Sequence, residues 1–403
     1  MFMRFEFEVT DTLSRITPFF EEDDSWVGER AEGVGNFINY SGQPIEFHYP
    51  VKSIHPDLLG LMCLCIFHPF IGSKVTFPQP VSPRLEEAFR NECFKKTLHF
   101  ENIDPEIPPY VGEKIALSFG GGIDSSAVRE LFPEAIVIHE AHIRDGVLVK
   151  SHAHDVVRNL PENRGYVIAS NQRYVSLPGG WHGWTCSTLT SILMATDFNI
   201  GIVLTGSILG STLLSNGKGY WNRFRARGWH GPTGNYWQSA FQKVGIPMFS
   251  PMTGASEFIT MDASLELLAK NEVVYCMEDN GNACNECTKC FRRATIRSVV
   301  DQNFEDDFEQ YNTRSIHAFL EKRPLYFGHI FSYAKRKNTL PEWIQQRIAD
   351  IPEITSDWPI KVHPKVYDFV ESPWSEIIQK RMQEHYPEMN ESELDEMENW
   401  TQI

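Results

Sequence analysis

The chain has 403 residues and a formal charge of −16, and its length predicts two or three domains with an ample core. This acidic balance disfavours a broad nucleic-acid-binding surface, because neutralising phosphates requires an excess of Lys and Arg. The longest apolar run, Leu58 to Phe67, is too short to cross a bilayer, and the first residues lack the apolar core of a signal peptide, so we expect a cytoplasmic protein without membrane contact.

Residues 1–110 predict a separate α+β module. Met3–Val9 alternates apolar and polar residues, as a half-buried strand does. Pro56–Phe67 and Pro83–Lys96 are typical of helices, and the proline-rich stretch Asp104–Pro109 indicates a linker. No catalytic motif is present in this region.

A glycine-rich loop follows the linker and joins a predicted strand, Ile115–Leu117, to a predicted helix. Three consecutive glycines, Gly120 to Gly122, allow a tight turn and leave backbone N–H groups uncovered by any Cβ atom. These N–H groups, the positive helix N-terminus and the hydroxyls of Ser125 and Ser126 together predict a phosphate-binding site.

The spacing of the loop distinguishes between kinds of phosphate site. The Walker form requires a Lys that is absent here, and the dinucleotide form Gly-x-Gly-x-x-Gly does not fit. Gly121-Gly122-Ile123-Asp124-Ser125 resembles the PP-loop of the ATP pyrophosphatases, Ser-Gly-Gly-x-Asp-Ser, although Gly120 stands where that motif has its first Ser. The resemblance implies cleavage of ATP between the α and β phosphates, adenylation of a substrate oxygen, and displacement of AMP by a nitrogen or sulfur nucleophile.

Strand and helix signals alternate over residues 111–300 and predict a doubly wound α/β domain with a parallel sheet, which the resemblance implies is adenine nucleotide α-hydrolase-like. Further strands are expected at 135–139, 166–169 and 201–206, with a helix over 187–198. Ligands bind such sheets beyond the carboxyl ends of the strands.

The ends of three strands are therefore expected to form the nucleotide site. At one of these ends, His139 could equally be a nucleotide ligand or a polar residue whose hydrogen bonds are made within the protein. Asp124 and Ser125 are the candidate catalytic residues; Asp124 would orient Mg²⁺ or the loop, while Ser125 and Ser126 would cap the helix and contact phosphate. The candidate ATP-binding residues are Ser118, Gly120, Gly121, Gly122, Asp124, Ser125, Ser126, His139, Thr205 and Gly206.

Two later segments, Gly179–Trp184 and Lys218–Gly234, are rich in glycine, aromatic residues and Arg. They predict long exposed loops. Aromatic rings can stack on a flat substrate and Arg can bind phosphate, so the segments are candidates for a lid over ATP or for ordinary surface segments.

Four cysteines predict a metal site at residues 276–290. Cys284, Cys287 and Cys290 form two successive Cys-x-x-Cys spacings, and Cys276 can supply a fourth thiolate. Lys289, Arg292 and Arg293 would offset the negative charge of the sulfurs. Thiolates suit both Zn²⁺ and an iron–sulfur cluster, and the residues alone leave both open.

The glycine loop followed by these cysteines and a basic helix is similar to 7-cyano-7-deazaguanine synthase and its relatives, some of which occur in antiphage systems. That resemblance covers residues 111–300 and implies a structural zinc and an ATP-dependent conversion of a carboxylate, or a modified base that carries one, into an amide or nitrile. Two alternatives remain: a PP-loop sulfur transferase with an iron–sulfur cluster, and a non-catalytic ATP-binding subunit, which the missing Ser at Gly120 suggests. A homodimer or a protein partner is compatible with each of these functions.

Residues 301–403 predict a helical, acidic C-terminal region. Surface helices are expected at Asp301–Gln310 and Leu340–Ile348. The last twenty residues could form a helix that docks on a partner, but their composition favours a polar terminus.

Overall fold

A computed structural model describes residues 3–29, 37–90, 97–177, 188–214, 237–276, 281–305 and 307–402. The chain forms two compact units. Unit 1 comprises Met1–Gly120, Glu134–Leu204 and Asn235–Phe249, and unit 2 comprises Gly121–Pro133, Thr205–Gly234 and Ser250–Ile403. The chain therefore leaves unit 1 directly after Gly120 and again after Leu204, two residues before the predicted end of the strand at 201–206.

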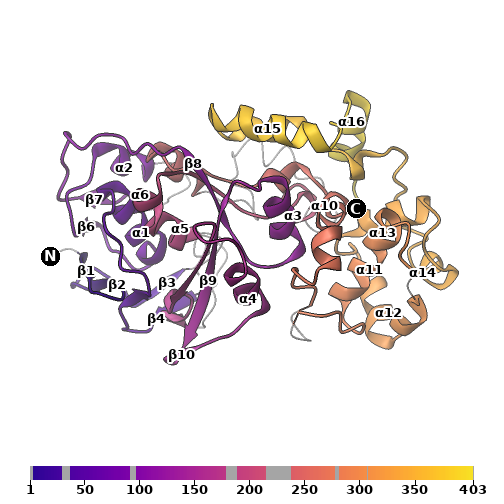
Figure 1. Ribbon diagram of the computed structural model, residues 1–403, viewed down its shortest axis with the longest axis horizontal. Helices are drawn as coiled ribbons and strands as arrows, with labels where there is room; N and C mark the ends of the chain where they lie inside the picture. The colour runs from indigo at the N-terminus through magenta and orange to yellow at the C-terminus, as the bar shows by residue number, and fades with distance from the viewer. Residues whose placement is uncertain are drawn as a thin grey trace. The chain divides into compact units, whose positions relative to one another are not determined.

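Unit 1 contains an eleven-stranded sheet in the order β14-β13-β8-β9-β11-β5-β2-β1-β6-β7, with β10 paired to β9 (Figure 1). Its strands are β1 (Met3–Val9), β2 (Ser14–Phe19), β5 (Ile45–Phe47), β6 (Lys74–Thr76), β7 (His99–Phe100), β8 (Lys114–Ser118), β9 (Ile136–Arg144), β10 (Val147–Leu148), β11 (Gly165–Ser170), β13 (Ile200–Leu204) and β14 (Met248–Phe249).

The parallel half of this sheet confirms the predicted strands after residue 114. Strands β14, β13, β8, β9 and β11 are mutually parallel neighbours. Along the chain they follow as β8, β9, β11, β13 and β14, so the strand order reverses between β8 and β13. Their continuous apolar runs are explained by burial, since every residue of β13 is buried.

The other half joins residues 1–110 to the same sheet through antiparallel strands, followed by the parallel strands β6 and β7. β5 pairs with β11 through Ser170 and Phe47, and β2 and β1 follow outward. One apolar core extends from Met3 to Met248. The sheet thus crosses the boundary that the sequence suggested near residue 110. A second, antiparallel sheet consists of β12 (Ser176–Leu177), β4 (Phe37–Tyr40) and β3 (Val27–Glu29).

The helices of unit 1 cover the sheet. They are α1 (Pro56–Phe67), α2 (Pro83–Ala88), α4 (His152–Arg158), α5 (Leu189–Leu193), α6 (Ala195–Phe198) and α9 (Gln238–Lys243), with a 3-10 turn η1 (Gln172–Tyr174). The prediction of α1 is confirmed. The predicted helix from Pro83 is observed only to Ala88, and residues 91–96 lie outside the described residues. The helix expected over 187–198 is divided at Met194 into α5 and α6.

Unit 2 is built from helices in the part of the chain that the structure describes (Figure 1). Helix α10 packs against both α3 and α11, and α11 packs against α13. The helices are α3 (Ile123–Leu131), α7 (Leu209–Thr212), α10 (Glu257–Ala269), α11 (Thr288–Val300), α12 (Arg314–Leu320), α13 (Gly328–Arg336), α14 (Glu342–Arg347), α15 (Trp374–His385) and α16 (Glu391–Asn399), with 3-10 turns η4 (Pro251–Gly254), η5 (Phe308–Tyr311), η6 (Trp358–Ile360) and η7 (Pro364–Phe369).

Two predictions for the C-terminal region are wrong. The helix expected at Asp301–Gln310 is replaced by turns and η5 among its described residues. The end of the chain is not merely polar, because α16 begins with a capping box at Asn390 and buries Leu394 and Met397. Sequence reasoning missed this because the buried residues are sparse among many carboxylates. The expected helix near 340–348 is present as α14.

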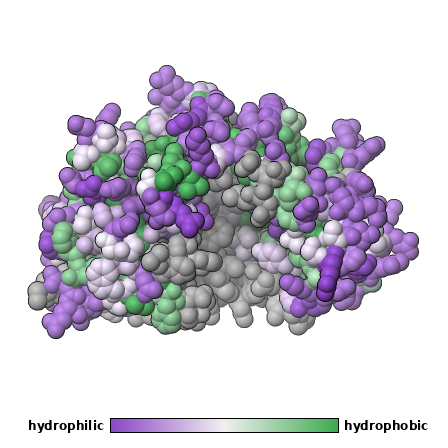
Figure 2. All heavy atoms as spheres, turned by 90° about the horizontal axis from the view of Figure 1, so that it is seen from below, coloured by the Kyte–Doolittle hydropathy of each residue, from purple (hydrophilic) through white to green (hydrophobic). Residues whose placement is uncertain are grey.

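Hydrophilic residues cover most of the described surface on the face drawn in Figure 2. Among the described helices, none is both long enough and apolar enough to span a bilayer.

Candidate functional site

The glycine loop has the backbone that its sequence requires. Gly121 has φ +79°, a conformation that favours glycine, and Gly122 is the N-cap of α3. A Cβ atom built on Gly120 or on Gly122 would meet no described atom within 4 Å, so the backbone is open on those sides. The first turn of α3, whose N–H groups have no partner within the helix, therefore follows a stretch of main chain that no side chain covers.

The two loop hydroxyls of α3 differ in their partners. Ser125 Oγ donates to the carbonyl oxygen of Gly122 at 3.1 Å. Ser126 Oγ is fully buried and has no hydrogen-bond partner among the described residues. A buried hydroxyl without a partner costs free energy, and an additional acceptor or donor at this helix end would remove that cost.

Gly206 lies against the start of α3 within unit 2. A Cβ atom at this position would be 2.7 Å from the backbone nitrogen of Ser125 and 2.9 Å from the carbonyl carbon of Asp124. Only glycine permits this approach of two backbones. The segment that follows β13 is therefore brought to the N-terminus of α3, as the strand-end argument predicted for Thr205 and Gly206.

Ser118 and His139 belong to unit 1. Ser118 ends β8 and is buried. In β9, His139 Nδ1 lies 2.8 Å from the carbonyl oxygen of Phe119 and Nε2 lies 3.2 Å from Ser151 Oγ. Burial lowers the pKa of His139 to about 4, so its imidazole is neutral at physiological pH. Both ring nitrogens have partners, which matches the reading of a satisfied polar residue.

Asp124 is partly buried and is held by α10. The Thr260 hydroxyl donates to Asp124 Oδ1 at 3.0 Å, and the Ser264 hydroxyl donates to the carbonyl oxygen of Ile123 at 3.0 Å. Burial raises the pKa of Asp124, whereas the charge of Arg293 lowers it. Helix α10 thus fixes both the carboxylate and the backbone at the start of α3.

The carboxylate of Glu257 and three cations on α11 surround this region of unit 2. Arg293 is buried and its Nη1 donates to the carbonyl oxygen of Val274 at 3.4 Å. The charges of Lys289 and Glu257 also act on Asp124. Arg292 lies over the Phe327 ring, with Cζ 4.2 Å from its centroid.

Glu257 is itself paired, because His329 Nε2 lies 2.8 Å from its Oε2. Both side chains are buried, with exposures of 7% for Glu257 and 0% for His329. Glu257 is also the first residue of α10, where the helix N-terminus favours a carboxylate.

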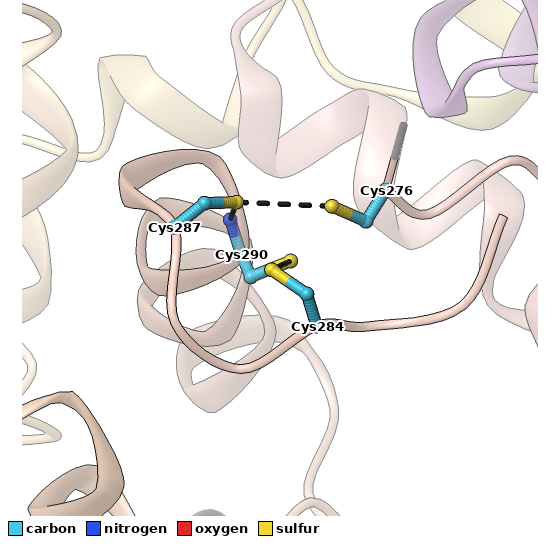
Figure 3. A group of neighbouring side chains, drawn as sticks. All are labelled: Cys276, Cys284, Cys287 and Cys290. Carbon is cyan, nitrogen blue, oxygen red and sulfur yellow. Dashed lines mark hydrogen bonds between the residues drawn. The ribbon is translucent and has the colours of Figure 1, made fainter. Parts of the chain in front are cut away.

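The four predicted metal ligands converge in unit 2 (Figure 3). Their sulfur atoms all lie within 4.8 Å of one another. The Cys276 and Cys287 sulfurs are 3.7 Å apart, and the Cys284 and Cys290 sulfurs are 3.6 Å apart. The arrangement can hold one metal ion among four thiolates.

The cysteine centre forms the start of α11. Cys287 is the N-cap, and its Sγ accepts a hydrogen bond from the backbone N–H of Cys290 at 3.3 Å. Burial raises the pKa of the Cys287 and Cys290 thiols, so a bound cation is needed to hold them as thiolates at neutral pH.

A cavity of about 350 Å³ lies on another side of the cysteine loop. Its lining includes Tyr275, Asn285, Arg297 and Tyr311, and none of the described residues from 118 to 126. Arg297 is already paired with Asp301, with Nε 2.9 Å from Oδ2. The cavity is therefore separate from the glycine loop and offers no uncompensated charge for a ligand.

The sequence identified the loop and the cysteines but missed the residues that connect them. Arg293 was expected to neutralise thiolates, whereas it also contacts the carbonyl oxygen of Val274 and acts on Asp124. Thr260 and Ser264, one helical turn apart, were a usable signal, since small hydroxyl residues on one helix face favour close helix contact. The expected lid, Gly179–Trp184 and Lys218–Gly234, lies outside the described residues.

The chain is thus a mixed α/β protein with a large, mostly parallel central sheet and a cysteine cluster able to hold a metal. Residues 236–401 match the sequence model of a family of unknown function, DUF6395. This match includes the cysteines, Thr260 and Arg293 but not the glycine loop. Neither the curated proteins nor the solved structures contain a significant match.

Proposed function

We propose that this protein is a PP-loop ATP pyrophosphatase that adenylates a carboxylate and transfers nitrogen to it. In the first step a carboxylate oxygen attacks the α-phosphorus of ATP, which forms an acyl-adenylate and releases pyrophosphate. In the second step ammonia attacks the acyl carbon, and an amide, AMP and a proton result. A cytoplasmic location fits the use of ATP.

The open glycine loop at the N-terminus of α3 carries this proposal. Gly121 has a left-handed backbone, Gly122 has free space where a side chain would lie, and Gly206 closes on the backbone of Ser125. Together they leave N–H groups and a helix N-terminus for an anion. Asp124 and Ser125 follow in the order that the PP-loop motif has.

The topology of unit 1 supports the same proposal independently. The parallel strand order reverses between β8 and β13, and in open α/β sheets ligands bind beyond the carboxyl ends at such a point. The chain enters the glycine loop after β8 and reaches Thr205 and Gly206 after β13. An adenine nucleotide α-hydrolase-like fold has the strands and loops needed for this arrangement.

Asp124 suits the handling of a Mg²⁺–nucleotide complex. When bound, Mg²⁺ would neutralise charge on the pyrophosphate leaving group. Burial raises the pKa of Asp124 and so disfavours its charged form. A cation delivered with the nucleotide would compensate that charge, and the Thr260 hydroxyl fixes Oδ1 for this role.

The cysteine centre fits a structural Zn²⁺. A tetrahedral site with zinc–sulfur bonds of about 2.3 Å separates its sulfurs by about 3.8 Å, close to the observed 3.6 and 3.7 Å. An iron–sulfur cluster places inorganic sulfides between its irons and spreads the cysteines apart, so four sulfurs within 4.8 Å favour a single ion. This geometry favours the nitrogen-transferring reaction over a cluster-dependent sulfur transferase.

Product analysis tests the proposed function. The purified, metal-loaded protein is incubated with ATP, Mg²⁺, ammonia and a panel of carboxylic acids that includes modified-base carboxylates. The proposal predicts equal amounts of AMP and pyrophosphate that depend on one acid. ADP with phosphate would contradict it, and ATP binding without turnover over the whole panel would favour a non-catalytic ATP-binding subunit.

A further inference from the structure

A single residue links the glycine loop to the basic helix of the cysteine centre. The backbone N–H of Val274 donates to the carbonyl oxygen of Gly121 at 2.7 Å. The carbonyl oxygen of Val274 in turn accepts a hydrogen bond from Arg293 Nη1 at 3.4 Å. Val274 is therefore the single residue that bridges the guanidinium of Arg293 and the main chain of the loop.

The cysteine centre holds both ends of this link. Cys276 lies two residues after Val274, and Cys290 lies three residues before Arg293 on α11. A metal ion bound to both cysteines would fix the segment at Val274 relative to the first turns of α11. The same ion thus fixes the distance between Arg293 and the loop.

Three cations of α11 have no direct ion pair with a carboxylate among the described residues. Among the described residues, no carboxylate lies within 4 Å of the side-chain nitrogens of Lys289, Arg292 or Arg293. Beyond that distance, the charge of Asp124 acts on all three cations, and that of Glu257 acts on Arg292. Cys276 acts on Lys289 and Arg293. Removing cations from water without pairing them is costly, and an incoming anion repays that cost.

We propose that Arg293 and Lys289 bind the pyrophosphate moiety of ATP together with the glycine loop, and that the cysteine centre positions both cations. This inference rests on the proposed function. It adds two cations to the phosphate site, and it gives the metal the role of positioning them. The guanidinium of Arg293 offers paired N–H donors for phosphate oxygens, and Lys289 offers a point charge. The buried hydroxyl of Ser126 is a further available group at the same helix end.

Calorimetric titration with inorganic pyrophosphate tests the inference on the full chain with its metal bound. The variants are Arg293→Met and Lys289→Met, and Arg297→Met is the matched control because Arg297 lies one turn further along α11 and pairs with Asp301. Loss of a hydrogen bond to a charged group predicts affinity weakened by roughly ten- to a hundredfold in Arg293→Met. Lys289→Met should show a smaller loss, and Arg297→Met should bind as the unaltered protein does.

Arg293 is buried, so each variant is first checked for metal content and melting temperature. Should Arg293→Met fail to fold, Lys289→Met decides the question, because Lys289 is only partly buried. Folded, metal-loaded variants that bind pyrophosphate as tightly as Arg297→Met overturn the inference. The inference also fails if the unaltered protein binds no pyrophosphate.

The outcomes separate this inference from the proposed function. If the unaltered protein forms AMP and pyrophosphate but the variants bind normally, only the role of Arg293 and Lys289 is wrong. If pyrophosphate binding depends on Arg293 but ATP is never cleaved between its α and β phosphates, the anion site stands and the proposed function is wrong. Metal removal provides a further check: pyrophosphate affinity should fall after chelation and return when Zn²⁺ is restored.

Discussion

Each of the two units of this protein is stabilised by a different set of internal interactions. In unit 1 an eleven-stranded sheet and one continuous apolar core join residues from Met3 to Met248. Unit 2 has no strand among its described residues, and its helices pack through buried rings such as Phe258, Phe291 and Phe331. Polar contacts such as Thr260 to Asp124 and the four cysteines add to this packing. The comparison predicts that the sheet makes unit 1 independent of a metal, whereas a metal held by the four cysteines would add to the stability of unit 2.

Among the variants that test this comparison, Cys287→Ser should have the largest effect, a loss of stability in unit 2. Loss of one of four ligands weakens metal binding, and we expect the melting transition of unit 2 to fall by on the order of 10 °C. Hydrogen exchange should show lost protection in α11 and retained protection in β8 and β13. The control is Cys63→Ala, a buried cysteine of α1 outside the cluster, which should keep the metal. Metal loss with unchanged protection of α11 would contradict the comparison.

Gly206→Ala should disturb the loop more than Gly122→Ala does. A Cβ at Gly206 would meet backbone atoms of Asp124 and Ser125, and such crowding costs roughly 1–3 kcal/mol. A Cβ at Gly122 meets no described atom within 4 Å, so the stability of that variant should change little. If phosphate approaches the loop there, however, Gly122→Ala should still lose ATP affinity. Denaturant unfolding and calorimetry separate the two effects.

Asp124→Asn should abolish turnover without destabilising the protein. The pKa of Asp124 is raised in the folded state, so its ionisation costs stability once the pH rises above the ordinary Asp value. The Asn variant removes that cost and should be at least as stable as the unaltered protein at pH 7, with the difference vanishing in acid. Unfolding free energies between pH 3 and 8 measure this. A large loss of stability at neutral pH would show that the carboxylate is structural.

Asp197→Ala should have the smallest effect on the site and confine its loss of stability to unit 1. Its carboxylate accepts hydrogen bonds from the backbone N–H groups of Lys52 and Ser53 and from the Tyr49 hydroxyl, at 2.8 to 3.0 Å. These bonds connect the N-terminal residues to α6, and their loss should cost about 2 kcal/mol. Metal content and pyrophosphate affinity should not change. A drop in either would show that the units are less independent than their bonding suggests.

The sequence predicted the parts of this protein that depend on local pattern. Apolar runs located β8, β9, β11 and β13, and the Cys-x-x-Cys spacings located the metal ligands. It did not predict that Phe47 pairs with Ser170, which extends one sheet across both halves of unit 1. Periodicity reports which face of a strand is buried, and it carries no information on the partner strand.

The same limit applies to the site. Gly121, Asp124 and Ser125 could be read from a short motif, because one turn of chain contains them. The contacts of Thr260 with Asp124 and of Arg293 with Val274 join residues that are 136 and 19 positions apart. Neither contact follows from spacing, since both depend on how α10 and α11 pack.

The central claim is that the glycine loop binds the phosphates of ATP. Hydrogen exchange of the metal-loaded protein, with and without ATP and Mg²⁺, tests it most directly. The account predicts slower exchange in peptides that cover Gly120 to Val128, reproduced by pyrophosphate alone and absent in Gly122→Ala. Tight ATP binding that leaves the exchange of this segment unchanged would contradict it.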